Sequence, residues 1–410
     1  MPLRGISQDL LAGLTVALVA LPLAIGFGVA SGAGAAAGIS TAIVAGLVAA
    51  IFGGSRFQVS GPTGAMTVVL IPLAAAHGIS AVLLVGFGSG LLLLLGAAIR
   101  LGDHIHKLPT ALIEGFTAGI ATVIALQQVP TGLGLEAGKG ESILTGALSA
   151  MGAWVDNPNW AALLTTVLIS TGLIWAGHRW NKLPLSLLAV VLVTAVNSVG
   201  QLGLATVGAL PAFGTLSVDW FSSIIHWQDL LLPMVSVALL GALESLLSAK
   251  IADRMRPDIK PHDSNRELFG QGIANLAAPF FGGIPATAAL ARTAVNVRAG
   301  AQSRWAAAFH AVILAAFVLV LGQLVQQVPL PALAGVLIAT ASHMVKPAEL
   351  KHTMGQSKLD GLVLIATLLV TVLFNLTAAV AVGLVLFLGL RGTRLSKANP
   401  PIDNEETLGD

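Results

Sequence analysis

Two ionisable side chains lie in mostly apolar stretches of the sequence, where we expect little contact with water. Glu244 is flanked by apolar residues throughout 239–248, with Ser248 one helical turn further on the same face. Arg292 lies about one turn into a short predicted helix. A carboxylate in apolar surroundings is most cheaply protonated or paired with a cation, and an arginine there can attract an anion or pair with Glu244. We favour a binding role for these two charged side chains over a purely structural one. The alternative is a neutral glutamic acid hydrogen-bonded within the core.

A second feature is a pair of short segments that are preceded by glycine and proline. Phe52-Gly53-Gly54 comes before Pro62-Thr63-Gly64, and Phe281-Gly282-Gly283 comes before Pro285-Ala286-Thr287. In transporters built from inverted repeats, interrupted helices at corresponding positions indicate the binding site, and their N-termini favour an anion. We therefore expect an anion site at the two helix starts. The alternative is that each Phe-Gly-Gly only ends a helix before a tight turn.

The elements that must position these residues are membrane helices. Of the 410 residues, 55% are hydrophobic and 10% are charged, against about 25% charged in soluble domains. This composition excludes a soluble globular protein and predicts an all-α polytopic membrane protein. We expect fourteen spans, at 9–30, 36–53, 62–77, 79–99, 109–129, 159–177, 183–199, 229–252, 267–282, 287–299, 305–327, 331–345, 360–375 and 376–393.

The distribution of lysine and arginine over the predicted loops supports this arrangement. Apart from Lys139 and Arg292, every Lys and Arg falls on the face shared by both termini. Lys139 lies on the other face, together with several carboxylates. By the positive-inside rule, both termini are expected in the cytoplasm.

Other kinds of site are not indicated. Cysteine is absent, and histidines such as His310 are expected at span ends or in loops without ligand spacing, so we expect no metal site, no cofactor and no enzyme. Gly138-Lys139-Gly140 lacks the rest of a phosphate loop. The basic loop 250–266 is interleaved with aspartates and predicts a solvated connection, with no nucleic acid as partner, although lipid headgroup contact stays open.

Several motifs, found along most of the chain, together resemble the sulfate permease (SulP) family of anion transporters, whose relatives include pendrin and prestin. They are Leu21-Pro22 with Phe27, Phe52-Gly53-Gly54-Ser55-Arg56 leading to Ser60-Gly61-Pro62, Glu114-Gly115-Phe116-Thr117-Ala118-Gly119, Ser264-Asn265-Arg266-Glu267-Leu268 with Gly270-Gln271-Gly272 and Asn275, and Ala291-Arg292-Thr293.

The resemblance implies 14 transmembrane segments in two inverted 7-segment repeats, with half-helices 3 and 10. It implies a mobile core domain of residues 9–105 and 229–328 and a gate domain of residues 106–228 and 329–395. Residues 396–410 are expected to be a cytoplasmic tail. The family's STAS domain is not expected in this sequence, which is either naturally short or truncated. The aromatic Gly-Leu-Tyr signature of many plant and animal members is replaced by Ala37-Gly38-Ile39-Ser40, which favours a prokaryotic member.

By the same resemblance, the substrate lies between the starts of the third and tenth helices. The implied substrate-binding residues are Phe27, Pro62, Thr63, Gly64, Thr287, Leu290, Ala291 and Arg292. Glu244 and Ser248 are the implied residues for a proton or coupling ion.

The function expected from these observations is secondary active transport of a small anion, with sulfate, bicarbonate or a C4-dicarboxylate such as fumarate as candidates. We expect proton-coupled symport, with sodium as the alternative, through alternating access and an elevator movement of the core in a bacterial inner membrane. A weak homodimer is expected. The alternative functions are an anion channel or exchanger, or a nucleobase:cation symporter of the same fold.

Overall fold

The computed structural model describes residues 3–105, 109–135, 143–180, 183–210, 216–222, 227–374 and 376–390. Helices account for most of them, as the composition predicts. Two short strands pair with each other in an antiparallel sheet. The predicted tail at 396–410 and the loop around Lys139 lie outside the described residues.

The α-helices run as follows, in chain order: α1 (Leu3–Ala30), α2 (Ala35–Phe52), α3 (Gly64–Ala98), α4 (Gly102–Ile105), α5 (Thr110–Gly132), α6 (Ile143–Asp156), α7 (Trp160–Arg179), α8 (Leu185–Gly200), α9 (Trp227–Met255), α10 (Ser264–Ala277), α11 (Leu290–Arg298), α12 (Trp305–Gln326), α13 (Leu330–Met344), α14 (Pro347–Gln356), α15 (Lys358–Leu373) and α16 (Leu376–Leu390). The strands are β1 (Ser60–Gly61) and β2 (Thr287–Ala288), and short 3-10 turns lie at Asp219–Ser222 and Ala278–Phe281.

Helices cover most of each range expected from hydropathy, although the range 267–282 ends in a 3-10 turn and the range 287–299 begins with β2. The third and fourth ranges form one element, α3, which is interrupted at Gly78 with φ 76° and ψ −177°. Glycine adopts this left-handed φ without strain, so the chain bends where the sequence predicted a break. Among the described residues, seven helices are long and apolar enough to cross a membrane.

Three helices were not expected: α4, α6 and α14. Each is shorter than a membrane span, so the search for long apolar runs overlooks it. Helix α14 begins at Pro347, where the fixed φ of proline suits the first helical turn.

The chain divides into two compact units. The first comprises Met1–Lys107 and Val123–His343, and the second comprises Leu108–Thr122 and Met344–Asp410. The proposed site lies wholly in the first unit. The core and gate boundaries predicted from the sequence remain a prediction.

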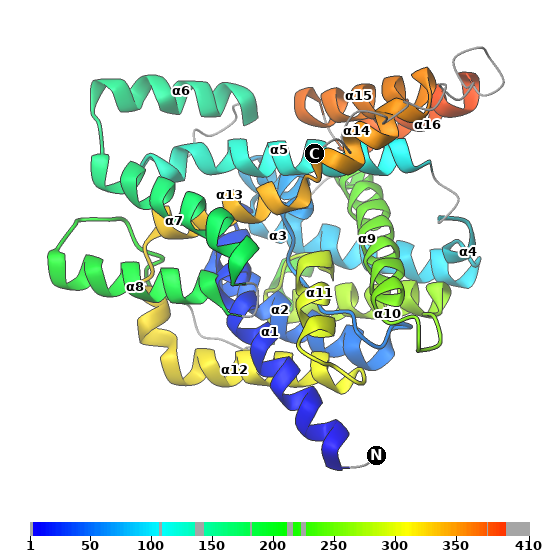
Figure 1. Cartoon of the computed structure of the whole chain (residues 1–410), viewed down its shortest axis with the longest axis horizontal. Coiled ribbons are helices and arrows are strands. Elements are labelled where there is room, and N and C mark those ends of the chain that lie inside the picture. The colour runs from blue at the N-terminus through cyan, green and yellow to red at the C-terminus, as the bar shows by residue number, and fades with distance from the viewer. Residues whose placement is uncertain are drawn as a thin grey trace, which may run out of the picture. The chain divides into compact units, whose positions relative to one another are not determined.

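Within the first unit, α10 packs on α2 and α3, and α1 packs on α2 and α12 (Figure 1). Small residues permit this close packing. A Cβ atom added at Gly90 on α3 would lie 2.8 Å from the Gly272 carbonyl oxygen of α10, closer than real side chains approach. Close backbone approach through glycine is typical of helices that pack in a membrane.

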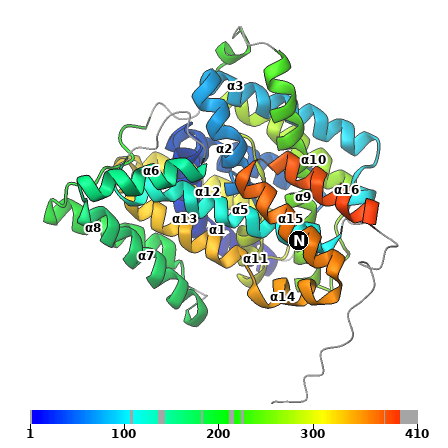
Figure 2. The same ribbon diagram turned by 90° about the horizontal axis from the view of Figure 1, so that it is seen from above.

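The second unit has a small apolar core of its own. Ala111 and Leu112 of α5 pack with Leu359, Val363 and Leu364 of α15. Helix α15 also runs beside α16, and the two lie together in both views (Figures 1 and 2). Much of the outward surface of α15 and α16 stays apolar, with Leu373, Val385 and Leu388 all exposed.

Candidate functional site

The two glycine- and proline-rich segments meet through the β1–β2 sheet. Ser60 pairs with Ala288 and Gly61 pairs with Thr287. The Ala289 N–H donates to the Val59 carbonyl oxygen at 3.2 Å and extends this contact. Helix α3 starts at Gly64 and α11 starts at Leu290, each shortly after its strand. Two helix starts far apart in the sequence are therefore brought together, as the repeated Phe-Gly-Gly predicted.

Each of the two loops that lead to this sheet is held by the other half of the chain. Glu267 of α10 accepts hydrogen bonds from the Gly54 and Ser55 N–H groups, both at 2.9 Å. In return, Ser40 and Thr41 of α2 donate to the carbonyl oxygens of Phe281 and Ile284. These reciprocal contacts fix both loops, and with them the two helix starts.

The first turns of α3 and α11 lack side-chain caps among the described residues. The residue before α3 is Thr63, whose hydroxyl instead donates to Glu244 Oε2 at 3.0 Å. The residue before α11 is Ala289, which has no capping group. Uncapped N-terminal N–H groups carry partial positive charge and can bind an anion.

The Arg292 side chain has hydrogen-bond donors that lack a partner among the described residues. It is 1% exposed, and its Nη2 donates to the Pro62 carbonyl oxygen at 3.1 Å. In the described part of the chain, its Nε and Nη1 have no hydrogen-bond partner. A Cβ atom at Gly61 would lie only 2.6 Å from Nη1, so the guanidinium needs a glycine beside it.

Glu244 is half-buried and links α9 to the start of α3 through Thr63. Its charge and that of Arg292 lie close enough to interact electrostatically. No direct ion pair joins the two among the described side chains. The carboxylate therefore has acceptor capacity left for a proton or a cation.

Phe27 and Gly64 lie against each other at the start of α3. A Cβ atom at Gly64 would overlap the Ile124 side chain of α5 and come 3.0 Å from the Phe27 ring, so glycine at this position lets both side chains approach the helix. Leu290 and Ala291 are exposed, whereas Thr63 is 6% exposed. The start of α11 is thus the accessible side of the arrangement.

Ser248 and Thr287 make contacts other than those expected of site residues. The Ser248 hydroxyl donates to Thr293 Oγ1 at 3.1 Å. Thr287 is fully buried, and its hydroxyl lies 2.8 Å from Ser245 Oγ. Both residues tie α9 to β2 and α11, and their part in binding stays a prediction.

Several polar residues around the site belong to a motif quoted from the sequence, but no role was predicted for them. On α10, Glu267, Gln271 and Asn275 recur every fourth residue and form one buried polar stripe. Gln271 donates to Ser60 Oγ at 2.7 Å, and Asn275 bonds both to and from Ala286. The four-residue spacing is the signal that could have identified this stripe.

His310 corrects an expectation. It was expected at a span end or in a loop without a special role, but it lies in the second turn of α12 and is fully buried. Helices α1 and α2 both pack on α12, and Gly13 lets the backbone of α1 come close, since a Cβ atom there would lie 2.9 Å from the His310 backbone nitrogen.

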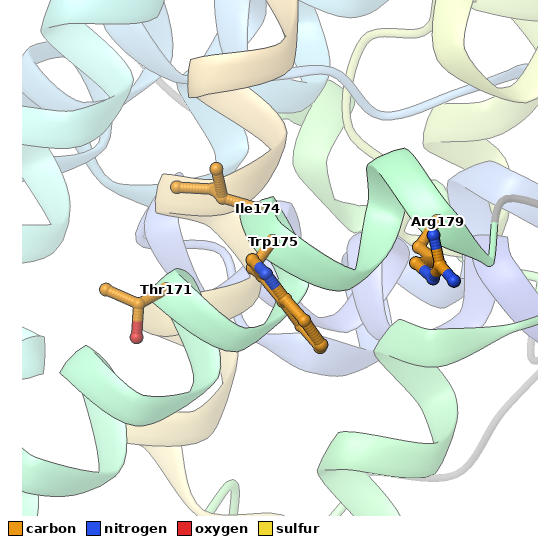
Figure 3. Close-up of a pocket in the computed structure, with 4 residues that line it drawn as sticks. All are labelled: Thr171, Ile174, Trp175 and Arg179. Carbon is orange, nitrogen blue, oxygen red and sulfur yellow. The ribbon is translucent and has the colours of Figure 1, made fainter.

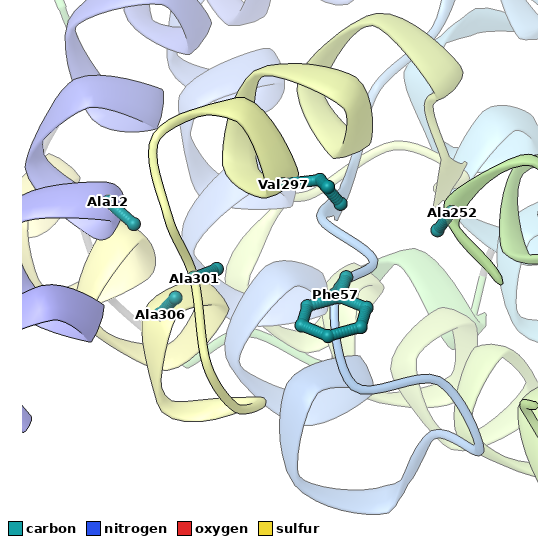
Figure 4. Close-up of a cluster of buried hydrophobic side chains, with 6 residues drawn as sticks. All are labelled: Ala12, Phe57, Ala252, Val297, Ala301 and Ala306. Atoms are coloured by element: carbon teal, nitrogen blue, oxygen red, sulfur yellow. The ribbon is translucent and has the colours of Figure 1, made fainter. Parts of the chain in front are cut away.

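An apolar cluster packs against α11 below the sheet. Phe57 lies in a buried cluster with Ala12 of α1, Ala252 of α9, Val297 of α11, Ala306 of α12 and Ala301 of the loop before α12 (Figure 4). The Arg256 guanidinium lies 5.3 Å from the centre of the Phe57 ring and donates to the Ala301 carbonyl oxygen. Its bond to the Asp258 carboxylate raises the pKa of Arg256 and lowers the pKa of Asp258. These contacts of Arg256 hold the start of the loop from α9 to α10 in place.

A surface groove lies elsewhere on the first unit. It has a volume of about 560 Å³ and is lined by Thr171, Ile174, Trp175 and Arg179, all on α7 (Figure 3). None of the predicted site residues lines it. Among the described residues, no group of three or more His, Asp or Glu could hold a metal ion.

Comparisons with known proteins agree with the motifs. The model of the sulfate permease family matches residues 6–367. The putative sulfate transporter YvdB of Bacillus subtilis is 36% identical over 99% of this chain and 77% of its own length. The bicarbonate transporter BicA of Synechocystis sp. is 33% identical over 93% of this chain and 68% of its own.

Solved structures have the same fold. The transmembrane domain of a cyanobacterium bicarbonate transporter BicA matches with a TM-score of 0.83 and 31% identity, covering 93% of this chain and 98% of that one. The murine Slc26a9 anion transporter in the inward-facing state matches with a TM-score of 0.84 and 18% identity, over 95% of this chain and 69% of that one. The second likeness shows the fold alone. The similar proteins are transporters and not enzymes.

Proposed function

The chain belongs to the sulfate permease family, and from this premise we propose that it carries a small oxyanion or carboxylate across a membrane. The observation that carries this proposal is the pair of uncapped helix starts, α3 and α11, beside the Arg292 guanidinium. Backbone N–H groups and a charged fork of donors together suit a planar or tetrahedral oxyanion.

The substrate class follows from these donors. An anion at the start of α11 would meet backbone N–H groups and the unpaired Nε and Nη1 of Arg292. Sulfate, bicarbonate and a C4-dicarboxylate such as fumarate all present oxygens of this kind, and two similar proteins are named for sulfate and bicarbonate. A nucleobase is a neutral ring, and a site for it would offer a pair of carboxylates. Among the described site residues Glu244 is the one carboxylate, which argues against a nucleobase.

Charge balance supports coupling to a cation. Arg292 and Glu244 bring one positive and one negative charge to the site. A bound anion would leave this half-buried site with a net negative charge, which is costly away from water. A proton on Glu244 cancels that charge for a monovalent anion such as bicarbonate and halves it for a divalent one such as sulfate, so anion and proton bind together more readily than either alone. Sodium would balance the charge in the same way and is the alternative.

The transport cycle that we propose is alternating access. The fourteen expected segments would form two inverted repeats of seven, with residues 9–105 and 229–328 moving as a core against residues 106–228 and 329–395. The reciprocal contacts of α2 and α10 support a core that keeps its two helix starts together as it moves. The proposed location is a bacterial inner membrane, with both termini in the cytoplasm.

Anion binding to the purified protein tests this proposal. Thermal unfolding is measured with sulfate, bicarbonate, fumarate and uracil, each against sodium chloride of equal ionic strength. A ligand that binds only the folded state raises the unfolding temperature. Because sulfate also stabilises proteins in general, the Arg292→Met variant serves as the reference, and Arg298→Met, on the exposed face of the same helix, is the matched control.

The expected result is stabilisation of the wild type and of Arg298→Met by at least one of the three anions, and its loss in Arg292→Met. Equal stabilisation of all three proteins would mean that the anion acts through the solvent. Stabilisation by uracil alone would favour the nucleobase symporter.

A further inference from the structure

Three arginines that the proposed transport site does not use gather where α2 ends. Arg304, the residue before α12, donates from Nη1 to the Ile51 carbonyl oxygen at 2.9 Å. Arg266 of α10 donates from Nε to the Phe52 carbonyl oxygen at 3.4 Å. Arg56 lies on the loop that follows α2, within electrostatic range of Arg304. We call these three arginines the cationic cluster.

The cluster has many more hydrogen-bond donors than its protein contacts use. A guanidinium group has five N–H donors. Among the described hydrogen bonds, one donor of Arg304 and one of Arg266 are used, and both go to carbonyl oxygens of the last turn of α2. Basic side chains commonly bond the last carbonyl oxygens of a helix. Capping of α2 therefore accounts for two donors and leaves Arg56 without a structural reason to be there.

The carboxylates nearby are engaged with other groups. Glu267 is buried and accepts from the Gly54 and Ser55 N–H groups, and Asp9 is buried and accepts from the Ser303 hydroxyl. Asp263 is exposed and caps the first turn of α10. The four ion pairs of the described side chains include none of the three clustered arginines.

The arginines of the cluster also repel one another. Partial burial, together with the positive charges of Arg266 and Arg56, lowers the pKa of Arg304. Arg56 and Arg266 are exposed, so an anion can reach them from outside the protein. A bound anion would relieve the repulsion and take up the unused donors.

The surroundings of the cluster are apolar and aromatic. Ile51, Phe52, Phe269 and Trp305 are all exposed, and the rings of Phe52 and Phe269 meet edge to face with their centres 6.4 Å apart. Exposed aromatic rings beside arginines are typical of the membrane–water interface, where rings lie at the level of the lipid headgroups. A soluble phosphate would gain nothing from this apolar rim, whereas a lipid would.

We propose that the cationic cluster binds the phosphate group of an anionic phospholipid, whose acyl chains lie along Phe52, Phe269 and Trp305. Guanidinium groups match the oxygens of a phosphate with paired N–H donors, and basic residues at a membrane surface attract anionic lipids. The positive-inside rule predicts that the cluster faces the cytoplasm, so the lipid comes from that leaflet. The site does not depend on which anion the protein transports.

Lipid binding to the purified full chain is the first test. Native mass spectrometry compares phosphatidylglycerol, which is anionic, with phosphatidylethanolamine, which has no net charge, both with the same acyl chains. Phosphatidylglycerol is expected to bind about tenfold more tightly or better, because each arginine near a headgroup favours the anionic lipid. Equal binding of the two lipids would overturn the proposal.

Variants locate the site. Replacing all three arginines of the cluster by glutamine should weaken phosphatidylglycerol binding about tenfold or more and leave phosphatidylethanolamine binding unchanged. The matched control loses the same charge from exposed positions of the same predicted face, through Arg254→Gln, Lys260→Gln and Arg298→Gln, and should bind as the wild type does. Equal losses in both triple variants would show attraction by net charge alone and overturn the site.

A single variant keeps the test valid if the triple variant does not fold. Arg56→Gln removes no hydrogen bond printed for the described residues, so its unfolding temperature should stay that of the wild type, while phosphatidylglycerol binding weakens about fivefold. Wild-type binding in Arg56→Gln would then overturn the proposal. Glycerol phosphate, which carries the phosphate without acyl chains, should not displace the lipid at a hundredfold excess. Displacement would identify a site for soluble phosphates and contradict the lipid.

Discussion

At the scale of single residues, the proposed site has one accessible side and one closed side. Ala291 is exposed at the start of α11, whereas Thr63 is buried and bonded to Glu244. Both were expected to lie close to the anion. Bulk added at position 63 must displace buried neighbours, and bulk added at position 291 need only fill the space in which the anion would bind.

We therefore expect Ala291→Trp to abolish anion transport while the protein still folds. The indole would cover the first N–H groups of α11 and exclude the anion by its volume. Proteoliposome uptake measures the loss, and the unfolding temperature verifies the fold. Ala153→Trp, an exposed alanine on α6, is the control and should transport normally. Normal uptake by Ala291→Trp would mean that the site lies elsewhere.

Glu244 gives a second prediction at this scale. Glu244→Gln keeps the size of the side chain and an acceptor for Thr63, but it cannot bind and release a proton. An inward proton gradient should then no longer accelerate uptake, while anion exchange can persist because it needs no net proton movement. Glu349→Gln, an exposed carboxylate on α14, should retain the acceleration. Unchanged acceleration at acidic external pH in Glu244→Gln would contradict the role of this residue as proton carrier.

At the scale of elements, the helices could be predicted, and the polar contacts that hold them together could not. Long apolar runs predicted where the helices lie, and glycine predicted the break at Gly78, because hydropathy and glycine are local signals. Glu267 lies in a polar stretch that is typical of a solvent-exposed helix end, yet its side chain is buried, with an exposed fraction of 2%. Its partners, Gly54 and Ser55, are 212 or more positions away, and hydropathy carries no information about such pairing.

The same limit explains why the burial of His310 and the hydrogen-bond partners of Ser248 and Thr287 could not be predicted. Which neighbour a polar side chain faces depends on the rotation of its helix and on contacts with residues far away in the sequence. Short helices such as α6 and α14 were missed because they are shorter than a membrane span.

Glu267→Gln tests the fastening of the first loop. The carboxylate accepts from two backbone N–H groups and from Gln271 Nε2, and an amide would turn an NH₂ group toward one of these donors. We expect a loss of about 1–3 kcal/mol in the free energy of unfolding, with the proton dependence of uptake unchanged. Glu349→Gln again serves as the control, since an exposed ion pair contributes about 0–1 kcal/mol. A thermal stability equal to that of the wild type would show that the loop is held by other contacts.

At the scale of the whole molecule, the apolar faces of α15 and α16 bear on assembly. Exposed side chains such as Leu373 and Val385 suit lipid as well as they suit another helix, so the hydrophobic effect gives little drive for pairing in a bilayer. We expect a homodimer that forms in membranes and separates in detergent. Light scattering of the purified protein measures this, and a dimer that stays intact in dilute detergent solution would contradict it.

The central claim is that this chain accumulates a small anion by coupling its movement to a cation. The most direct measurement is uptake of labelled sulfate, bicarbonate and fumarate into proteoliposomes with an imposed pH or sodium gradient. The account predicts saturable uptake of at least one anion, with accumulation above the external concentration when protons, or alternatively sodium ions, are driven inward. Uptake that never saturates and only equilibrates would indicate a channel, and uptake of none of the three anions would contradict the proposed function.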